Sequence, residues 1–217
     1  VHPTEPQAGS DVGAVRTRAE PLGAGTHAIT GQKIFITWAD SDFIANTCHL
    51  VLARLPDGPP GTRGISLFMV PKFIPDAEGN PGPRNGVSVV SLEDKLGLHG
   101  SPTAVMQFDA ARGWLVGAPH RGMAAMFTMM NNARLGVGVQ GVGVAEAATQ
   151  AALAYALERR QGGAGTIVDH ADVRRMLAVM KAETFSARAI ALACAVALDM
   201  GGATGSAEWA ARAALLT

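Results

Sequence analysis

Proline divides this chain into two parts. All 12 prolines among the 217 residues lie at or before Pro119, and none follows it. Proline lacks a backbone N–H donor and disrupts the interior of a helix, so a long segment without proline permits long helices. We therefore expect two domains, a first one over residues 1–120 and a helical one over residues 121–217.

Several short apolar or alternating runs before Pro119 indicate β-strands. Glycine, proline, asparagine or aspartate bounds these runs, as is common for strands. The runs are THAITGQKIFITW, HLVLARL, GISLFMVPK, GVSVVSL and TAVMQFDA. We expect a turn at Thr30–Gly31 within the first of them. Short strands at this spacing favour an antiparallel β-sandwich or a barrel-like domain.

The segment after Pro119 has the residue spacing of helices. From Arg121 to Arg160, alanine, methionine and leucine recur with charges at helical spacing, which predicts one helix of about 40 residues and roughly 60 Å. Gly162–Gly165 separates it from a second helix, and residues 206–217 are predicted to form a third. The fold class is thus α+β, with a β-domain followed by part of an antiparallel helical bundle.

Charge and cysteine content weigh against several classes of protein. The chain has 18 Lys plus Arg and 18 Asp plus Glu, whereas nucleic-acid binding needs a basic footprint and a balanced chain does not support a membrane-surface module. The longest apolar run, Ala189–Leu198, is about half of the roughly 20 residues that span a bilayer. Cys48 and Cys194 fit no metal spacing, and two free thiols favour the cytoplasm. We expect no metal, nucleic-acid or membrane partner.

Gly136, Gly138 and Gly141 have the GxGxxG spacing of a dinucleotide-binding loop. Such a loop follows a strand and opens a helix, whereas the residues before Gly136, MFTMMNNARL, form a helical run. Each glycine inside a helix costs about 1 kcal/mol, so we expect close packing to compensate. These glycines are predicted to lie within a tightly packed helix and not at a pyrophosphate.

Two segments near the start of the chain carry a family resemblance. TEPQAGSD (residues 4–11) is rich in turn formers, and its Gly9 and Ser10 leave room and N–H donors for a ligand. ITGQKIFIT follows at residues 29–37. With RGISLFMVPK, EDKLGLHGSPTAVMQFD and NNARLGVGVQGVGVAEAATQAALAYALERRQ, these segments resemble acyl-CoA dehydrogenases over nearly the whole chain. HGSPTAVM and ALERRQG are most similar to the branch that acts on methylthiopropionyl-CoA.

The resemblance implies an FAD-dependent oxidoreductase of fatty acid metabolism. Family members oxidise an acyl-CoA thioester to the 2,3-enoyl-CoA, with a base taking the α-proton and flavin N5 taking the β-hydride. The resemblance also implies a homodimer or homotetramer that passes electrons to an electron-transfer flavoprotein. An N-terminal helical domain and the end of the C-terminal domain are expected to lie outside this chain.

The catalytic base is not expected within this chain. In most of the family it is a glutamate in the later helical part, which corresponds to a position beyond Thr217. A minority carries the base where this sequence has Ala133, which cannot take a proton. Glu146 is interpreted as a helix-surface or packing carboxylate.

The resemblance further implies which residues of the β-domain hold the flavin. Thr4 and its neighbours would bond the pyrimidine ring, where hydrogen-bond donors favour the charge of the reduced flavin. Phe35 takes the place of an aromatic residue that packs on the flavin, and the Thr37 hydroxyl would lie near N5. The full set in this domain is Pro3, Thr4, Gly9, Ser10, Phe35, Ile36 and Thr37.

Other implied contacts come from the helical segment. Arg134 matches an arginine that helps to hold the CoA part of the substrate, with Ser10 and Asn131 as further substrate-binding residues. Arg159 matches an arginine that reaches the FAD diphosphate of a neighbouring subunit, because its guanidinium suits phosphate oxygens. Gln161 is expected at the same cofactor. From the residues alone, Arg159 also fits a solvated helix end favoured by the helix dipole.

Two alternative functions remain open. An acyl-CoA oxidase-like flavoenzyme on the same scaffold would release peroxide. A non-catalytic scaffold protein that keeps the fold would bind no flavin.

Overall fold

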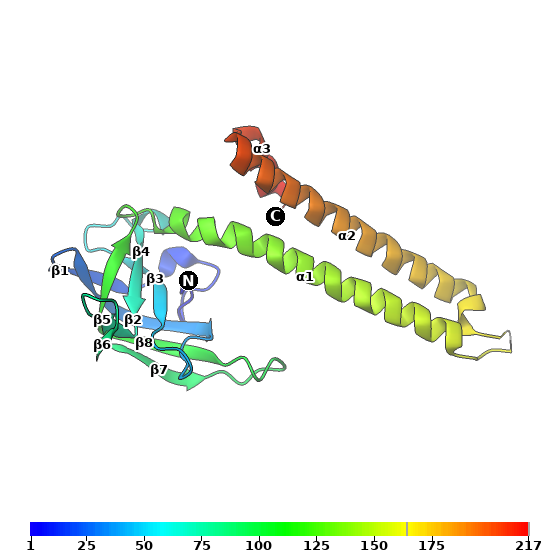
Figure 1. Ribbon diagram of the computed structural model, residues 1–217, viewed down its shortest axis with the longest axis horizontal. Helices are drawn as coiled ribbons and strands as arrows, with labels where there is room; N and C mark the ends of the chain where they lie inside the picture. Colours follow the sequence, from blue (N-terminus) through cyan, green and yellow to red (C-terminus); the bar gives the residue numbers. More distant parts are fainter. Residues whose placement is uncertain (164, 217) are drawn as a thin grey trace. The chain divides into compact units, whose positions relative to one another are not determined.

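Strands fill the first part of the chain and helices the second, over residues 1–163 and 165–216 that a computed structural model describes (Figure 1). The strands are β1 (Arg18–Gly23), β2 (Thr26–Thr37), β3 (Cys48–Arg54), β4 (Ile65–Pro71), β5 (Phe73–Pro75), β6 (Pro81–Arg84), β7 (Val87–Leu92) and β8 (Thr103–Val116). The helices are α1 (Gly122–Glu158), α2 (Ala171–Thr204) and α3 (Ala207–Leu216). Contacts divide the chain into two units, Val1–Thr128 and Met129–Thr217, with the boundary inside α1.

The strands of the first unit close into a barrel. The sheet order is β2-β1-β3-β4-β8-β7, and β2 also pairs with β8. The strands β2-β1-β3-β4-β8 therefore form a closed ring, and β7 extends the sheet beside β8. The long pairings are antiparallel, whereas β1 and β3 meet in parallel at Arg18 and Arg54. The expected barrel-like β-domain is confirmed.

The barrel interior is filled by side chains from alternating strand positions. Ile29, Val51, Phe68, Met106 and Phe108 are all buried in one cluster. Burying a side chain of this size stabilises the fold by on the order of 2 kcal/mol. The cluster fixes which face of each strand points inward, and hence which residues remain at the surface.

The turn expected at Thr30–Gly31 is wrong. β2 runs without a break from Thr26 to Thr37, and the hairpin turn lies at Ala24–Gly25, where both residues have positive φ. Gly31 has another reason to be glycine, because a Cβ there would lie 2.4 Å from Thr17 Oγ1. Thr17 thus packs directly on the backbone of β2.

In the second unit, α1 and α2 form an antiparallel helical hairpin. Thr149 and Thr184 lie 3.3 Å apart through their hydroxyl oxygens, and Glu146 Oε2 accepts a hydrogen bond from Arg188 at 2.6 Å. The residue number of the partner in α2 rises as the residue number in α1 falls, as in an antiparallel pair. α3 packs on α2. These helices confirm the expected part of an antiparallel bundle.

The glycines of the GxGxxG spacing lie within α1, as expected. Their expected tight packing is not found among the described residues, because a Cβ at Gly136, Gly138 or Gly141 would meet nothing within 4 Å. Their context differs from that of a dinucleotide loop, since the residues directly before Gly136 belong to α1 and not to a strand.

By length and composition alone, α2 is long and apolar enough to cross a membrane. Its longest uninterrupted apolar run, Ala189–Leu198, is by itself shorter than a bilayer span. Its most apolar 18-residue window has a mean hydropathy of 1.4 and is 11% buried within the described chain. A single such helix is a weak indication, because core helices pass the same test.

Candidate flavin and acyl-CoA site

The TEPQAGSD segment lies against β2 and turns tightly on itself. Ile34 N donates a hydrogen bond to Thr4 O at 3.0 Å. Glu5 and Ala8 exchange backbone hydrogen bonds of 2.9 and 3.0 Å, which closes a short turn. Gly9 and Ser10 follow this turn and are exposed. The segment therefore leaves its last residues open to a ligand.

A bulge in β2 turns Phe35 out of the barrel. Regular alternation would place residues 33 and 35 on the same face, but Lys33 is fully buried and Phe35 is 60% exposed. The register with β8 shifts between Lys33 and Ile36, and Phe35 has a φ of 62°. Bulges re-aim side chains near active sites, and a left-handed φ at a residue other than glycine costs on the order of 1–3 kcal/mol.

A cavity of about 280 Å³ opens at this bulge and brings three of the expected flavin residues together, Phe35–Thr37. Trp38, half-exposed, adds a second aromatic ring. Thr37 Oγ1 lies 3.0 Å from Thr103 Oγ1 of β8. Two buried polar atoms in the cavity wall, His2 Nδ1 and Thr47 Oγ1, lack a hydrogen-bond partner among the described residues. The cavity thus combines aromatic surface with unused polar atoms.

Two buried histidines form the inner wall of this cavity. His49 Nδ1 and His2 Nε2 lie 3.2 Å apart, and both rings contact Phe108 edge-on. Burial lowers the pKa of His49 to about 4. Burial, with the neighbouring His49, lowers the pKa of His2 to about 2. Both rings are therefore neutral at pH 7.

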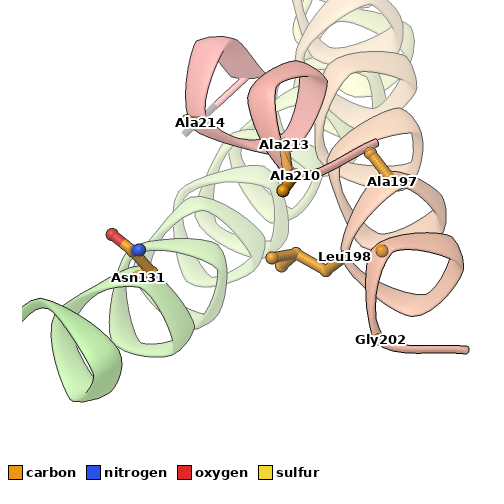
Figure 2. A pocket seen from close by; sticks show the side chains of 8 residues that line it. Asn131, Ala197, Leu198, Gly202, Ala210, Ala213 and Ala214 are labelled. Atoms are coloured by element: carbon orange, nitrogen blue, oxygen red, sulfur yellow. The ribbon is translucent and has the colours of Figure 1, made fainter. Parts of the chain in front are cut away.

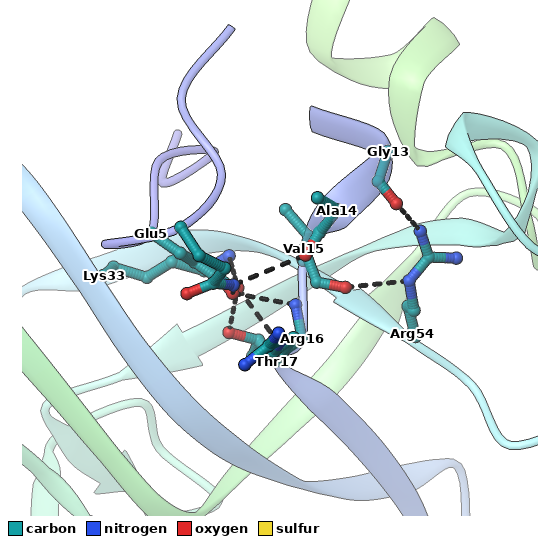
Figure 3. A network of polar contacts seen from close by, with 9 residues as sticks. Glu5, Gly13, Ala14, Val15, Arg16, Thr17, Lys33 and Arg54 are labelled. Atoms are coloured by element: carbon teal, nitrogen blue, oxygen red, sulfur yellow. Dashed lines mark hydrogen bonds and ion pairs between the residues drawn. The ribbon is translucent and has the colours of Figure 1, made fainter. Parts of the chain in front are cut away.

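Beneath the same segment, Glu5 is the centre of a buried polar network (Figure 3). Its carboxylate accepts hydrogen bonds from Lys33 Nζ at 2.8 Å, Arg16 N at 2.7 Å and Thr17 Oγ1 at 2.5 Å. Burial alone would raise the pKa of Glu5, but the Lys33 ammonium and these donors lower it to about 2. Arg54 holds the neighbouring segment through Gly13 O and Val15 O.

The two substrate-binding residues expected in α1 line different cavities of the second unit. Asn131 borders a cavity of about 230 Å³ between α1, α2 and α3, into which Leu198 of α2 extends (Figure 2). Arg134 borders a cavity of about 330 Å³ with Gly138, Gly141 and Cys194. Gly138 and Gly141 therefore widen a cavity beside an arginine.

Arg159 and Gln161 lie just beyond the far end of α1. Both are exposed, and the 28 positions between Asn131 and Arg159 correspond to roughly 40 Å along a helix. The structure does not bring Arg159 and Gln161 to the cavities that Asn131 and Arg134 line. Glu146, in contrast, is paired with Arg188 of α2 and accepts a hydrogen bond from Gln150, which agrees with a packing role.

The comparison with protein families follows the two units. The model of the acyl-CoA dehydrogenase middle domain matches residues 2–111, and that of the C-terminal domain matches residues 120–215. The chain belongs to the acyl-CoA dehydrogenase family. This confirms the resemblance seen in the TEPQAGSD and ITGQKIFIT segments.

Among acyl-CoA dehydrogenase relatives, 3-methylmercaptopropionyl-CoA dehydrogenase of Ruegeria pomeroyi is 51% identical over 91% of this chain and 35% of its own length. Butyryl-CoA dehydrogenase of Syntrophomonas wolfei is 42% identical over 91% of the chain and 35% of its length. The crystal structure of Caenorhabditis elegans ACDH-11 in complex with C11-CoA superposes with a TM-score of 0.84 at 29% identity, covering 100% of this chain and 36% of that one. The chain spans about a third of the length of these relatives.

Sequence reasoning missed several residues of the site. Glu5 and Lys33 lie within the TEPQAGSD and ITGQKIFIT segments but were assigned no role, and no role was predicted for His2 or His49. The one available signal of a buried charge was Lys33. By strand alternation it shares a face with Gly31 and Phe35, where an apolar residue is expected.

Proposed function

We propose that the complete protein is an FAD-dependent acyl-CoA dehydrogenase that converts an acyl-CoA thioester into the 2,3-enoyl-CoA. The observation that carries this proposal is the cavity at the β2 bulge, in a chain that matches both family domains. The 51% identity to a 3-methylmercaptopropionyl-CoA dehydrogenase makes a short thioether acyl group the first substrate to test.

The residues around the β2 bulge fit a flavin ring. Phe35 and Trp38 offer exposed aromatic surface for a planar ring, and Thr37 offers a hydroxyl. The unpartnered His2 Nδ1 and Thr47 Oγ1 are able to bond ring heteroatoms or a bridging water. We assign Pro3, Thr4, Gly9, Ser10 and Ile36 to the same cofactor. When bound, FAD supplies the two-electron oxidation.

In the helical unit, we assign Arg134 and Asn131, with Ser10 of the β-domain, to the acyl-CoA. The Arg134 guanidinium suits the phosphate groups of CoA, and the apolar wall of its cavity suits an acyl or pantetheine chain. We place the catalytic base beyond Thr217, because Glu146 is already paired with Arg188.

We assign Arg159 and Gln161 to the FAD of a neighbouring subunit, in a homodimer or homotetramer. Their separation from Arg134 along α1 supports this assignment, since one cofactor site does not easily include both ends of a helix of this length. We propose that α2 packs in the helical bundle and not in a bilayer. We further propose a cytoplasmic enzyme that passes electrons to an electron-transfer flavoprotein.

An anaerobic titration of the purified complete protein tests this function. Adding 3-methylmercaptopropionyl-CoA or butyryl-CoA is expected to bleach the flavin absorbance, and electron-transfer flavoprotein is expected to restore it. Peroxide released in proportion to substrate would favour the oxidase-like alternative. A colourless protein that does not take up FAD would favour the non-catalytic scaffold.

A further inference from the structure

Hydrogen bonds at adjacent positions join the TEPQAGSD segment to β2, the strand whose Phe35–Thr37 line the candidate flavin cavity. Ile34 N bonds Thr4 O at 3.0 Å, and one residue further Lys33 Nζ bonds Glu5 Oε1 at 2.8 Å. Thr4 directly precedes Glu5, and Phe35 follows Lys33 by two residues. The ion pair therefore links the segment that carries Thr4 to the strand that carries Phe35, and both residues are proposed flavin contacts.

Both partners of the ion pair are locked in place. Lys33 is fully buried and Glu5 is 3% exposed. Arg16 N, Thr17 N and Thr17 Oγ1 also donate to the Glu5 carboxylate. Buried charges are tolerated where they are paired and hydrogen-bonded. These bonds hold the Glu5 side chain in a single conformation. Neither Glu5 nor Lys33 lines the cavity itself.

Lys33 also marks one end of the β2 bulge. The register with β8 is regular from Gly31 to Lys33 and resumes at Ile36, and between Lys33 and Ile36 Phe35 has its left-handed φ of 62°. Such a conformation persists only where the surrounding structure enforces it. The Lys33–Glu5 pair holds one end of the bulge, and the contact between Thr37 and Thr103 holds the other.

We propose that the Glu5–Lys33 ion pair is a positioning element of the flavin site. It sets the TEPQAGSD segment against the β2 bulge so that Thr4 and Phe35 face one flavin ring. This inference rests on the proposed function. It adds two residues that act through their neighbours and do not touch the cofactor.

FAD binding by the complete protein tests the proposal through Lys33→Met and Glu5→Gln. The readouts are the dissociation constant of the apoprotein for FAD and the visible circular dichroism of the bound flavin. Each variant is expected to raise the dissociation constant by about tenfold, since small displacements of positioning residues have large effects, and to change the dichroism.

Asn85→Ala is the matched structural control. Asn85 is buried and bonds Pro71 O, Gly86 N and Arg112 in the same barrel. This variant is expected to lower the melting temperature while leaving the FAD dissociation constant within about twofold of the parent value. An equal loss of FAD affinity in Asn85→Ala would overturn the proposal, since general destabilisation would then suffice.

The double variant Glu5→Gln/Lys33→Met tests the positioning role if a single variant does not fold. It removes both buried charges, so it is expected to regain stability but keep the weakened FAD binding. FAD affinity and dichroism equal to the parent in the double variant, or in both folded single variants, would refute the positioning role. A parent protein that binds no FAD would instead refute the proposed function.

Discussion

Replacing Lys33 by methionine leaves the Glu5 carboxylate buried without its cation. Removing one partner of a buried ion pair typically destabilises a protein by about 3–5 kcal/mol. Glu5 keeps donors from Arg16 and Thr17 in this variant, so we expect the lower end, about 3 kcal/mol. Glu5→Gln takes the carboxylate from the fully buried Lys33, and we expect the upper end of that range.

The double variant Glu5→Gln/Lys33→Met measures the coupling between the two charges. Because the double variant leaves neither charge buried without a partner, its loss of stability is expected to be smaller than that of either single variant, so the single losses do not add. Urea unfolding of the complete protein, followed by tryptophan fluorescence at pH 7, gives the free energies. Single losses below about 1 kcal/mol, or losses that add, would show that this pair behaves as a surface ion pair and would refute the reasoning.

The pH dependence gives the same cycle a second readout. The pKa of Glu5 is lowered from 4.5 to about 2 in the folded protein. The unfolded chain therefore binds the proton more readily, and the stabilisation by this carboxylate is complete above pH 4.5 and is lost as the pH falls towards 2. The advantage of the parent over Lys33→Met is expected to shrink in that window.

Three further predictions concern other parts of the chain. Gly31→Ala places a Cβ 2.4 Å from Thr17 Oγ1 and should destabilise by about 1–3 kcal/mol in urea unfolding; an unchanged midpoint would contradict the close approach. His49 is neutral when folded, with its pKa lowered from 6.5 to about 4, so stability should fall as pH drops through that interval, by up to about 3 kcal/mol. His49→Gln should flatten the melting-temperature profile there, and an unaltered slope would count against this. Glu146→Gln should break the pair with Arg188 but keep flavin reduction by acyl-CoA within about twofold; loss of reduction would identify Glu146 as the base.

Local pattern was sufficient to predict much of the barrel. β3, β4, β7 and the first half of β8 lie where alternating or apolar runs indicated strands, and α1 begins one residue after Arg121. β1 was missed because Pro21, Arg18 and Glu20 interrupt its apolar pattern. The closure of the ring through β2 and β8 joins residues 66 to 88 positions apart, a separation that a local sequence window does not cover.

The candidate site was predictable only in part. Family motifs pointed to Phe35 and Thr37, and the structure brings both to one cavity. The bulge that exposes Phe35 depends on the register with β8, so strand alternation alone gives the wrong face. The burial of Glu5 likewise follows from barrel packing, whereas its sequence neighbours Pro6 and Gln7 are exposed.

The location of the flavin is the central claim, and a crystal structure of the complete protein with its bound cofactor tests it most directly. The account predicts isoalloxazine density against residues 3–10 and 35–37, with the Thr37 hydroxyl in hydrogen-bond contact with the ring. Isoalloxazine density seated against Gly136–Gly141, away from the β2 bulge, would contradict it.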